Sequence, residues 1–148
     1  MGKKSNLLYI VDDGQDYRFL VEQTFKRFIP QYNVQFFASG DELVAHITHE
    51  MAMLEPNSGS LRPDLILLDM HMPGQNGLQT LTELRRHSVW RSVPVVMMSN
   101  ASSQSERDAC YEAGANSFLI KPVGMEQLRE MLATICHYWL RMNQLPSA

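Results

Sequence analysis

The sequence has little of several features that mark specialised protein classes. Its 148 residues include 2 cysteines, Cys110 and Cys136, and neither lies in a CxxC or Cys/His ligand pattern. Two cysteines cannot form a disulfide framework, so we expect two buried thiols in a reducing compartment. Glycine and proline are also sparse, with 8 and 7 residues, while 45% of the chain is hydrophobic. This composition excludes collagen-like and disordered chains and predicts an ordinary globular protein.

The chain also lacks an excess of positive charge and any long hydrophobic run. Lys and Arg total 13 against 16 Asp and Glu, for a formal charge of −3. This balance argues against nucleic-acid binding, which needs a basic footprint. The apolar run at 7–11 is shorter than the roughly 7–15 residues of a signal peptide, and no run approaches the roughly 18 of a membrane span. We therefore predict a cytoplasmic protein with no nucleic-acid or membrane partner.

Short apolar runs alternate along the chain with segments of helical periodicity. Two segments that begin with the capping-box pattern, 39–42 and 103–106, mark helix starts, because a serine hydroxyl and a glutamate can satisfy each other's backbone N–H groups. In the first helical segment Tyr17, Val21, Phe25 and Phe28 share one face, which we expect to be buried. The last helix is predicted over 125–142. The apolar runs, which we interpret as strands, are 7–11, 34–37, 65–68, 95–98 and 118–120.

Fivefold strand–helix alternation predicts an α/β fold. Right-handed crossovers then produce a doubly wound, five-stranded parallel sheet with helices on both faces. The run at 34–37 alternates apolar and polar residues, which is typical of an edge strand. The segment 53–63 exceeds the usual connection of about 2–6 residues and is interpreted as a surface insertion. We expect a single domain over 1–148, with a core of about 6–142.

Polar side chains follow most of the predicted strands at the point where each ends. They are Asp12 and Asp13, Asp69, Ser99 and Lys121. Open parallel sheets bind ligands beyond the carboxyl ends of their strands, so these side chains are expected to meet. Three converging carboxylates repel one another, and a divalent cation relieves that repulsion. Because the ligands are all oxygens, the predicted cation is Mg²⁺.

This set of residues resembles the receiver domain of two-component response regulators. The resemblance is carried by Asp12-Asp13, the run 69–77, Ser99, and Lys121-Pro122 preceded by Phe118, and it extends from Leu7 to about Met142. It implies the CheY-like strand order 2-1-3-4-5. The chain is similar to single-domain members of the family, since no output domain is expected after the last helix.

The resemblance implies a role for each acidic residue. Asp69 would be the nucleophile that takes a phosphoryl group from the phosphohistidine of a kinase or phosphotransfer protein. Asp13 and Asp69 would ligate Mg²⁺ directly, while Asp12 would act largely through water. The backbone carbonyl of His71 would supply a further ligand. Such a protein is a phosphoacceptor that catalyses only its own phosphotransfer and dephosphorylation.

The resemblance also implies roles for residues at the last two strand ends. Lys121 would pair with Asp69 before phosphorylation and with a phosphoryl oxygen afterwards. A cis peptide before Pro122 is expected to turn this lysine into the cleft. Ser99 would donate its hydroxyl to the phosphoryl group, and the Phe118 ring would then rotate inward. This coupling would change the surface of the fourth helix, fifth strand and fifth helix.

Three residues are expected to tune the lifetime of the acyl phosphate. Asn100 stands where the family usually has Ala or another small residue, and its bulk would restrict access to Asp69 or alter the choice of phosphodonor. His71 and Ala101 occupy positions that flank the path of the attacking water in the family.

Partners and alternatives follow from the same resemblance. A histidine kinase or phosphotransfer protein would act upstream, an unidentified protein downstream, and a homodimer could form through the surface of the fourth helix, fifth strand and fifth helix. A degenerate receiver that signals by dimerisation alone is one alternative. A flavodoxin-like FMN carrier is another, although its Ser/Thr-rich phosphate loop is replaced here by the acidic segment 12–16.

Overall fold

One parallel sheet organises the chain in the computed structural model, which describes residues 6–53, 62–101 and 103–146. Its order is β2-β1-β3-β4-β5, as the family resemblance implies. The interpretation of 53–63 as an insertion falls mostly on residues outside the described part. The strands are β1 (Leu7–Val11), β2 (Asn33–Phe37), β3 (Leu65–Asp69), β4 (Val95–Ser99) and β5 (Ser117–Ile120).

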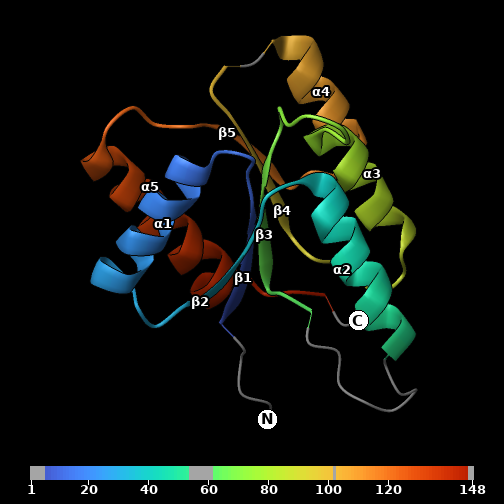
Figure 1. Ribbon diagram of the computed structural model, residues 1–148, viewed down its shortest axis with the longest axis horizontal. Coiled ribbons are helices and arrows are strands. Elements are labelled where there is room, and N and C mark those ends of the chain that lie inside the picture. The colour runs from blue at the N-terminus through green and yellow to red at the C-terminus, as the bar shows by residue number, and fades with distance from the viewer. Residues whose placement is uncertain (1–5, 54–61, 102, 147–148) are drawn as a thin grey trace.

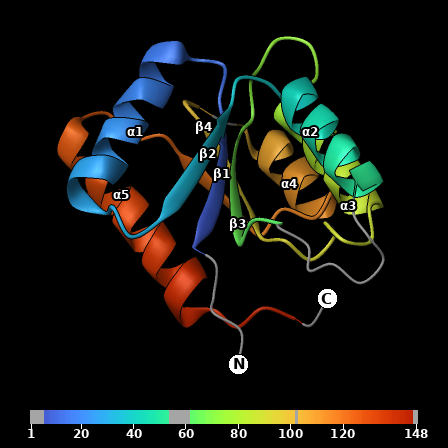
Figure 2. The same ribbon diagram turned by 60° about the horizontal axis from the view of Figure 1, so that its bottom comes forward.

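Helices cover both faces of the sheet, so the predicted α/β architecture is confirmed. Figures 1 and 2 show α1 and α5 on one face and α2, α3 and α4 on the other. None of the helices in the described part is long and apolar enough to cross a membrane. The helices are α1 (Gln15–Phe28), α2 (Gly40–Met53), α3 (Gly77–Arg86), α4 (Gln104–Glu112) and α5 (Met125–His137).

The buried strands supply both layers of the core by simple alternation. In β1, Leu8 and Ile10 pack on the side of α1 and α5, while Tyr9 and Val11 pack on the side of α2, α3 and α4. β3 and β4 are buried along their whole length in the same way. This explains why these runs are continuously apolar in the sequence, since a strand covered on both faces has no solvent side.

Two helix ends depart from the predicted periodicity. Phe28, expected on the buried face of α1, is 47% exposed, and Ile29 is buried instead because the helix ends there. At the other end of the chain α5 is followed by a single π-helical turn, Tyr138–Met142. The wider turn brings Leu140 into the core and leaves Trp139 half-buried.

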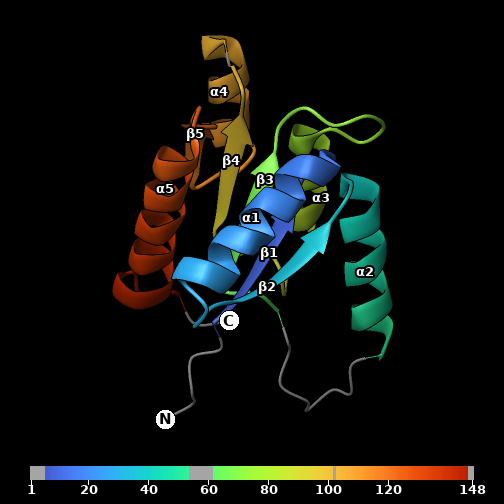
Figure 3. The ribbon, with the colours of Figure 1, turned by 60° about the vertical axis from the view of Figure 1, so that its left-hand side comes forward.

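The parallel strands bring their carboxyl ends to one edge of the molecule. Figure 3 shows the arrows of β1, β3 and β4 pointing toward the same side. The loops at that edge run into helices with defined caps: Asn76 and Gln79 form a capping box on α3, and Ser103 and Glu106 form one on α4. The site described below lies at this edge.

Candidate functional site

Three carboxylates meet beyond the ends of β1 and β3. Asp12 and Asp13 directly follow β1, and Asp69 is the last residue of β3. One oxygen from each lies within 4.8 Å of one from each of the others. Asp12 and Asp69 are 3% and 5% exposed, whereas Asp13 is exposed. The predicted acidic cluster is therefore present, and one of its members faces solvent.

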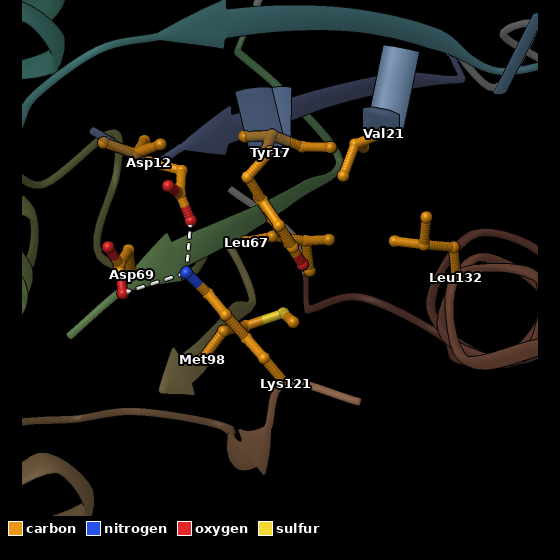
Figure 4. A pocket seen from close by; sticks show the side chains of 10 residues that line it. Asp12, Tyr17, Val21, Leu67, Asp69, Met98, Lys121 and Leu132 are labelled. Carbon is orange, nitrogen blue, oxygen red and sulfur yellow. Dashed lines mark hydrogen bonds and ion pairs between the residues drawn. The ribbon is translucent and has the colours of Figure 1, made fainter. Parts of the chain in front are cut away.

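A buried ammonium group lies against two of these carboxylates. The Nζ of Lys121 is 2.5 Å from Oδ2 of Asp12 and 3.5 Å from Oδ1 of Asp69 (Figure 4). Lys121 comes directly after β5, and its backbone N–H donates to the Ser99 carbonyl at 2.7 Å. The expected pairing with Asp69 is present, but the shorter contact is with Asp12.

The expected cis peptide before Pro122 is wrong, because no peptide bond in the described part of the chain is cis. The hydrogen bonding between β4 and β5 continues through the backbone N–H of Lys121. The long side chain of Lys121 reaches the cleft from this trans backbone.

The site has more negative than positive charge, and this imbalance affects the pKa of the Asp69 carboxyl. Burial raises the pKa of Asp69 to about 6, and the negative charges of Asp12 and Asp13 also raise it. Lys121 and the backbone N–H of His71, which lies 3.4 Å from Oδ1, oppose this shift. One ammonium cannot neutralise three carboxylates. A cluster of oxygen ligands with excess negative charge fits a hard divalent cation such as Mg²⁺.

Tyr17 closes the side of the cleft that faces α1. Its ring centroid is 4.4 Å from Nζ of Lys121, a cation–π contact, and it lines a cavity together with Asp12, Asp69 and Lys121 (Figure 4). Burial, followed by the charges of Asp12 and Asp69, raises the pKa of its hydroxyl. The helical periodicity assigned Tyr17 to the core. Its position in the first turn after the acidic strand end is the signal that indicates a site residue.

The remaining predicted site residues lie around the end of β4. The Ser99 side chain is fully buried, and its hydroxyl donates to the Ala101 carbonyl and lies 3.2 Å from Nδ1 of His71. Asn100 and Ala101 are exposed. Phe118 is half-buried and packs against the core on the side of α2, α3 and α4.

Glu106 joins this group from α4, although the sequence indicated it only as the last residue of the capping box 103–106. Its Oε2 lies 2.7 Å from Nε2 of His71. The hydrogen bond from His71 is the largest cause of a lowered pKa of Glu106. The residues are 35 positions apart, so only the tertiary structure brings them together.

Comparison with known protein families matches residues 8–133 to the response regulator receiver domain. The chain belongs to this family. It is therefore a two-component phosphoacceptor rather than a conventional enzyme, and a receiver domain implies partnership with a histidine kinase. This membership favours the receiver interpretation over a flavodoxin-like FMN carrier.

Similar proteins include single-domain receivers over their full length. The chain is 26% identical over 151 residues to the response regulator Rcp1 of Synechocystis, covering 100% of both chains. The phosphorylated cyanobacterial phytochrome response regulator RcpA superposes with a TM-score of 0.81 at 25% identity, over 95% of this chain and 98% of that one. The receiver domain of the sensor kinase PA1611 from Pseudomonas aeruginosa, which has a magnesium ion in its active-site cleft, superposes with a TM-score of 0.70 at 25% identity, over 90% and 96%.

Proposed function

We propose that this receiver is a phosphorylation-dependent switch that accepts a phosphoryl group on Asp69 from a histidine kinase or phosphotransfer protein. One observation carries the proposal. The Asp69 carboxylate lies in a buried cleft beside two further carboxylates, with the Lys121 ammonium 3.5 Å away. The whole chain, 1–148, would act as one such domain, and its place of action would be the cytoplasm beside the kinase.

The chemistry of the step follows from these groups. An Asp69 oxygen attacks the phosphorus of the donor phosphohistidine, the P–N bond breaks, and the donor leaves as imidazole while an acyl phosphate forms. Phosphoryl transfer needs mainly in-line positioning and neutralisation of the equatorial oxygens. Lys121, held between Asp12 and Asp69, is placed to exchange a carboxylate contact for a phosphoryl oxygen.

Bound Mg²⁺ would supply positive charge to the phosphoryl oxygens. Asp13, Asp69 and the backbone carbonyl of His71 would hold it directly. The oxygens of Asp12 are already engaged, since Oδ1 accepts from the Gly14 N–H at 2.9 Å and Oδ2 contacts Lys121. Asp12 therefore fits the expected role of acting through water.

The output would pass from Ser99 to Phe118. Ser99 must release the Ala101 carbonyl before its hydroxyl can reach a phosphoryl group. The space it leaves would admit the half-buried Phe118 ring and alter the surface of α4, β5 and α5. That surface carries exposed apolar side chains, including Tyr111 and Ile120 at 50% and 51% exposure, which suits a downstream protein or a second copy of the chain.

The exposed rim of the cleft would set the lifetime of the acyl phosphate. His71, Asn100 and Ala101 are exposed beside the buried Asp69 and Ser99. Water must pass these side chains to hydrolyse the phosphoryl group. Their size and polarity are thus expected to tune dephosphorylation.

Intact-mass measurement after incubation with Mg²⁺ and acetyl phosphate tests the proposal. We expect the mass of one added phosphoryl group in the wild-type protein and no addition in Asp69→Asn. The matched control is Asp108→Asn, which changes an exposed aspartate of α4 and should label like the wild type. Equal labelling of the Asp69 variant would reject Asp69 as the acceptor. Because RcpA is a phytochrome response regulator, a phytochrome-type kinase is the first protein donor to assay.

A further inference from the structure

A chain of polar contacts joins α4 to the buried serine of the site. It runs from Glu106 in the first turn of α4, through the His71 ring in the loop after β3, to Ser99 at the end of β4. The His71 ring contacts Oε2 of Glu106 through Nε2 at 2.7 Å and Oγ of Ser99 through Nδ1 at 3.2 Å. The ring thus links the first turn of α4 to the end of β4 through side chains.

The direction of the first contact follows from the chemistry of its partners. An ionised carboxylate only accepts hydrogen bonds, so Nε2 of His71 carries the hydrogen and donates it. The other oxygen of Glu106, Oε1, accepts from the backbone N–H of Ser103 at 3.2 Å and so caps α4. One carboxylate therefore fixes both the start of the helix and the orientation of the imidazole.

The contact between Glu106 and His71 is important for α4 because little of this helix is buried in the core. Among its residues, Gln104–Glu112, Cys110 is the only buried one. At the other end of the helix, the carbonyl of Gly114 accepts from Nη2 of Arg85 at 2.8 Å. The amino end has the Glu106–His71 bond as its side-chain link to the site.

We propose that Glu106 is a positioning residue that holds the His71 ring 3.2 Å from Oγ of Ser99, where the ring restricts movement of this side chain and so keeps the Ser99 hydroxyl in its resting position on the Ala101 carbonyl. This rests on the proposed function: engagement of a phosphoryl group by Ser99 must break the chain, which also frees the first turn of α4. Phosphorylation and the position of α4 are then coupled through one exposed hydrogen bond, and the strength of that bond sets how readily the switch responds.

Glu106→Gln breaks the bond without removing the helix cap. Glutamine also forms the capping box, but with its carbonyl oxygen on the Ser103 N–H its amide NH2 faces Nε2 of His71, so a donor replaces the acceptor of the Nε2 hydrogen. The matched control is Glu42→Gln, because Glu42 has the same capping role on α2, with the Ala38 N–H donating to its carboxylate at 3.2 Å and Ser39 Oγ accepting from its own N–H at 3.1 Å.

The probe is beryllofluoride with Mg²⁺, a mimic of a phosphoryl group on a carboxylate, titrated by NMR. We expect Glu106→Gln to bind it about three- to tenfold more tightly than the wild type, the range expected for one hydrogen bond. The ¹⁵N shifts of the His71 ring should also change before any ligand is added, since the acceptor of the Nε2 hydrogen is lost. Glu42→Gln should match the wild type in both measurements.

Unchanged or weaker binding by Glu106→Gln, unchanged His71 shifts, or an equal gain in Glu42→Gln would each overturn the inference. Failure of the proposed function looks different. In that case the wild-type protein itself would bind no beryllofluoride and accept no phosphoryl group.

Discussion

Two partly buried cations lie at opposite ends of the sheet and are satisfied in opposite ways. At the amino ends of β4 and β5, the Arg85 guanidinium donates to the carbonyls of Gly114, Trp90 and Val93 and to Oδ1 of Asn116, over 2.8–3.3 Å. At the carboxyl end, Lys121 lies between two carboxylates of a cluster of three.

This difference indicates that Arg85 stabilises the fold, whereas Lys121 belongs to the functional site. Arg85 has five fixed neutral contacts to backbone and amide oxygens, and its partners have no charge to exchange. Lys121 is outnumbered by negative charge, so its surroundings favour a further cation, and its contacts to the carboxylates can be exchanged when such a cation binds. Polar groups with complete partners stabilise a fold, and groups with an excess of one charge are placed for binding.

The largest expected effect is on stability, from Arg85→Met. The substitution removes the guanidinium donors from the carbonyls of Gly114 and Val93, and we expect the free energy of unfolding to fall by about 3 kcal/mol. Urea denaturation measures this loss, and Mg²⁺ affinity should be unchanged. The control is the neighbouring Arg86→Met, whose side chain is 72% exposed and pairs with Glu83; it should change stability by less than about 0.5 kcal/mol. Equal losses in the two variants would contradict the clamp role of Arg85.

Asp69→Asn should stabilise the protein at pH 8 by about 2 kcal/mol, because it removes a carboxylate whose pKa burial raises from 3.8 to about 6. The folded state holds this proton more tightly than the unfolded state. Wild-type stability should therefore fall as the pH rises from about 4 to about 6, then stay low.

Urea denaturation from pH 4 to pH 8 tests this prediction, with a flatter profile expected for Asp69→Asn. The exposed Asp108→Asn serves as its control and should follow the wild-type profile. A wild-type stability that rises between pH 4 and pH 6 with a slope lost in Asp69→Asn would show that the Asp69 carboxylate is favourably paired instead.

Lys121→Gln should increase Mg²⁺ affinity about tenfold, because it removes a competing positive charge from the carboxylate cluster. Titration of intrinsic tyrosine and tryptophan fluorescence measures the affinity. Lys26→Gln removes an exposed ammonium 3.8 Å from Glu22 and should leave it unchanged. If Lys121→Gln binds Mg²⁺ no more tightly than the wild type, the Lys121 ammonium does not compete with a metal ion for the carboxylates. Lys121 then does not differ from Arg85 in the way described above.

The smallest expected effect concerns the ring beside Lys121. Tyr17→Leu removes the cation–π contact and should lower the free energy of unfolding by about 1 kcal/mol more than Tyr17→Phe, which keeps the ring. In the Lys121→Gln background the difference between Leu and Phe should vanish. A difference of the same size in both backgrounds would assign the effect to packing alone.

The alternation of runs and the residues at their ends were enough to predict the sheet and most of the cleft. Asp69 is the last residue of a strand, and Asp12 and Lys121 directly follow one, so parallel strands bring all three to one edge. Periodicity, however, reports only which side of a helix is apolar. It placed Tyr17 with Val21 in the core, although the first turn of α1 reaches past the sheet to the site.

Contacts between side chains from different elements were beyond such reasoning. The Arg85 contacts at the base of β5 and the Glu106–His71 bond carry no local signature, because each joins segments far apart in the sequence. The peptide bond before Pro122 is trans, contrary to the cis bond that the family resemblance implied.

The order of residues along the chain by itself determined the five strands, the helices between them and the acidic edge, since period and strand direction are local properties. Which cation neutralises which carboxylate, how far each side chain is buried, and what holds α4 to the site were decided only by the tertiary structure. Electrostatic energy and hydrogen bonding depend on distances between elements, and packing alone sets those distances.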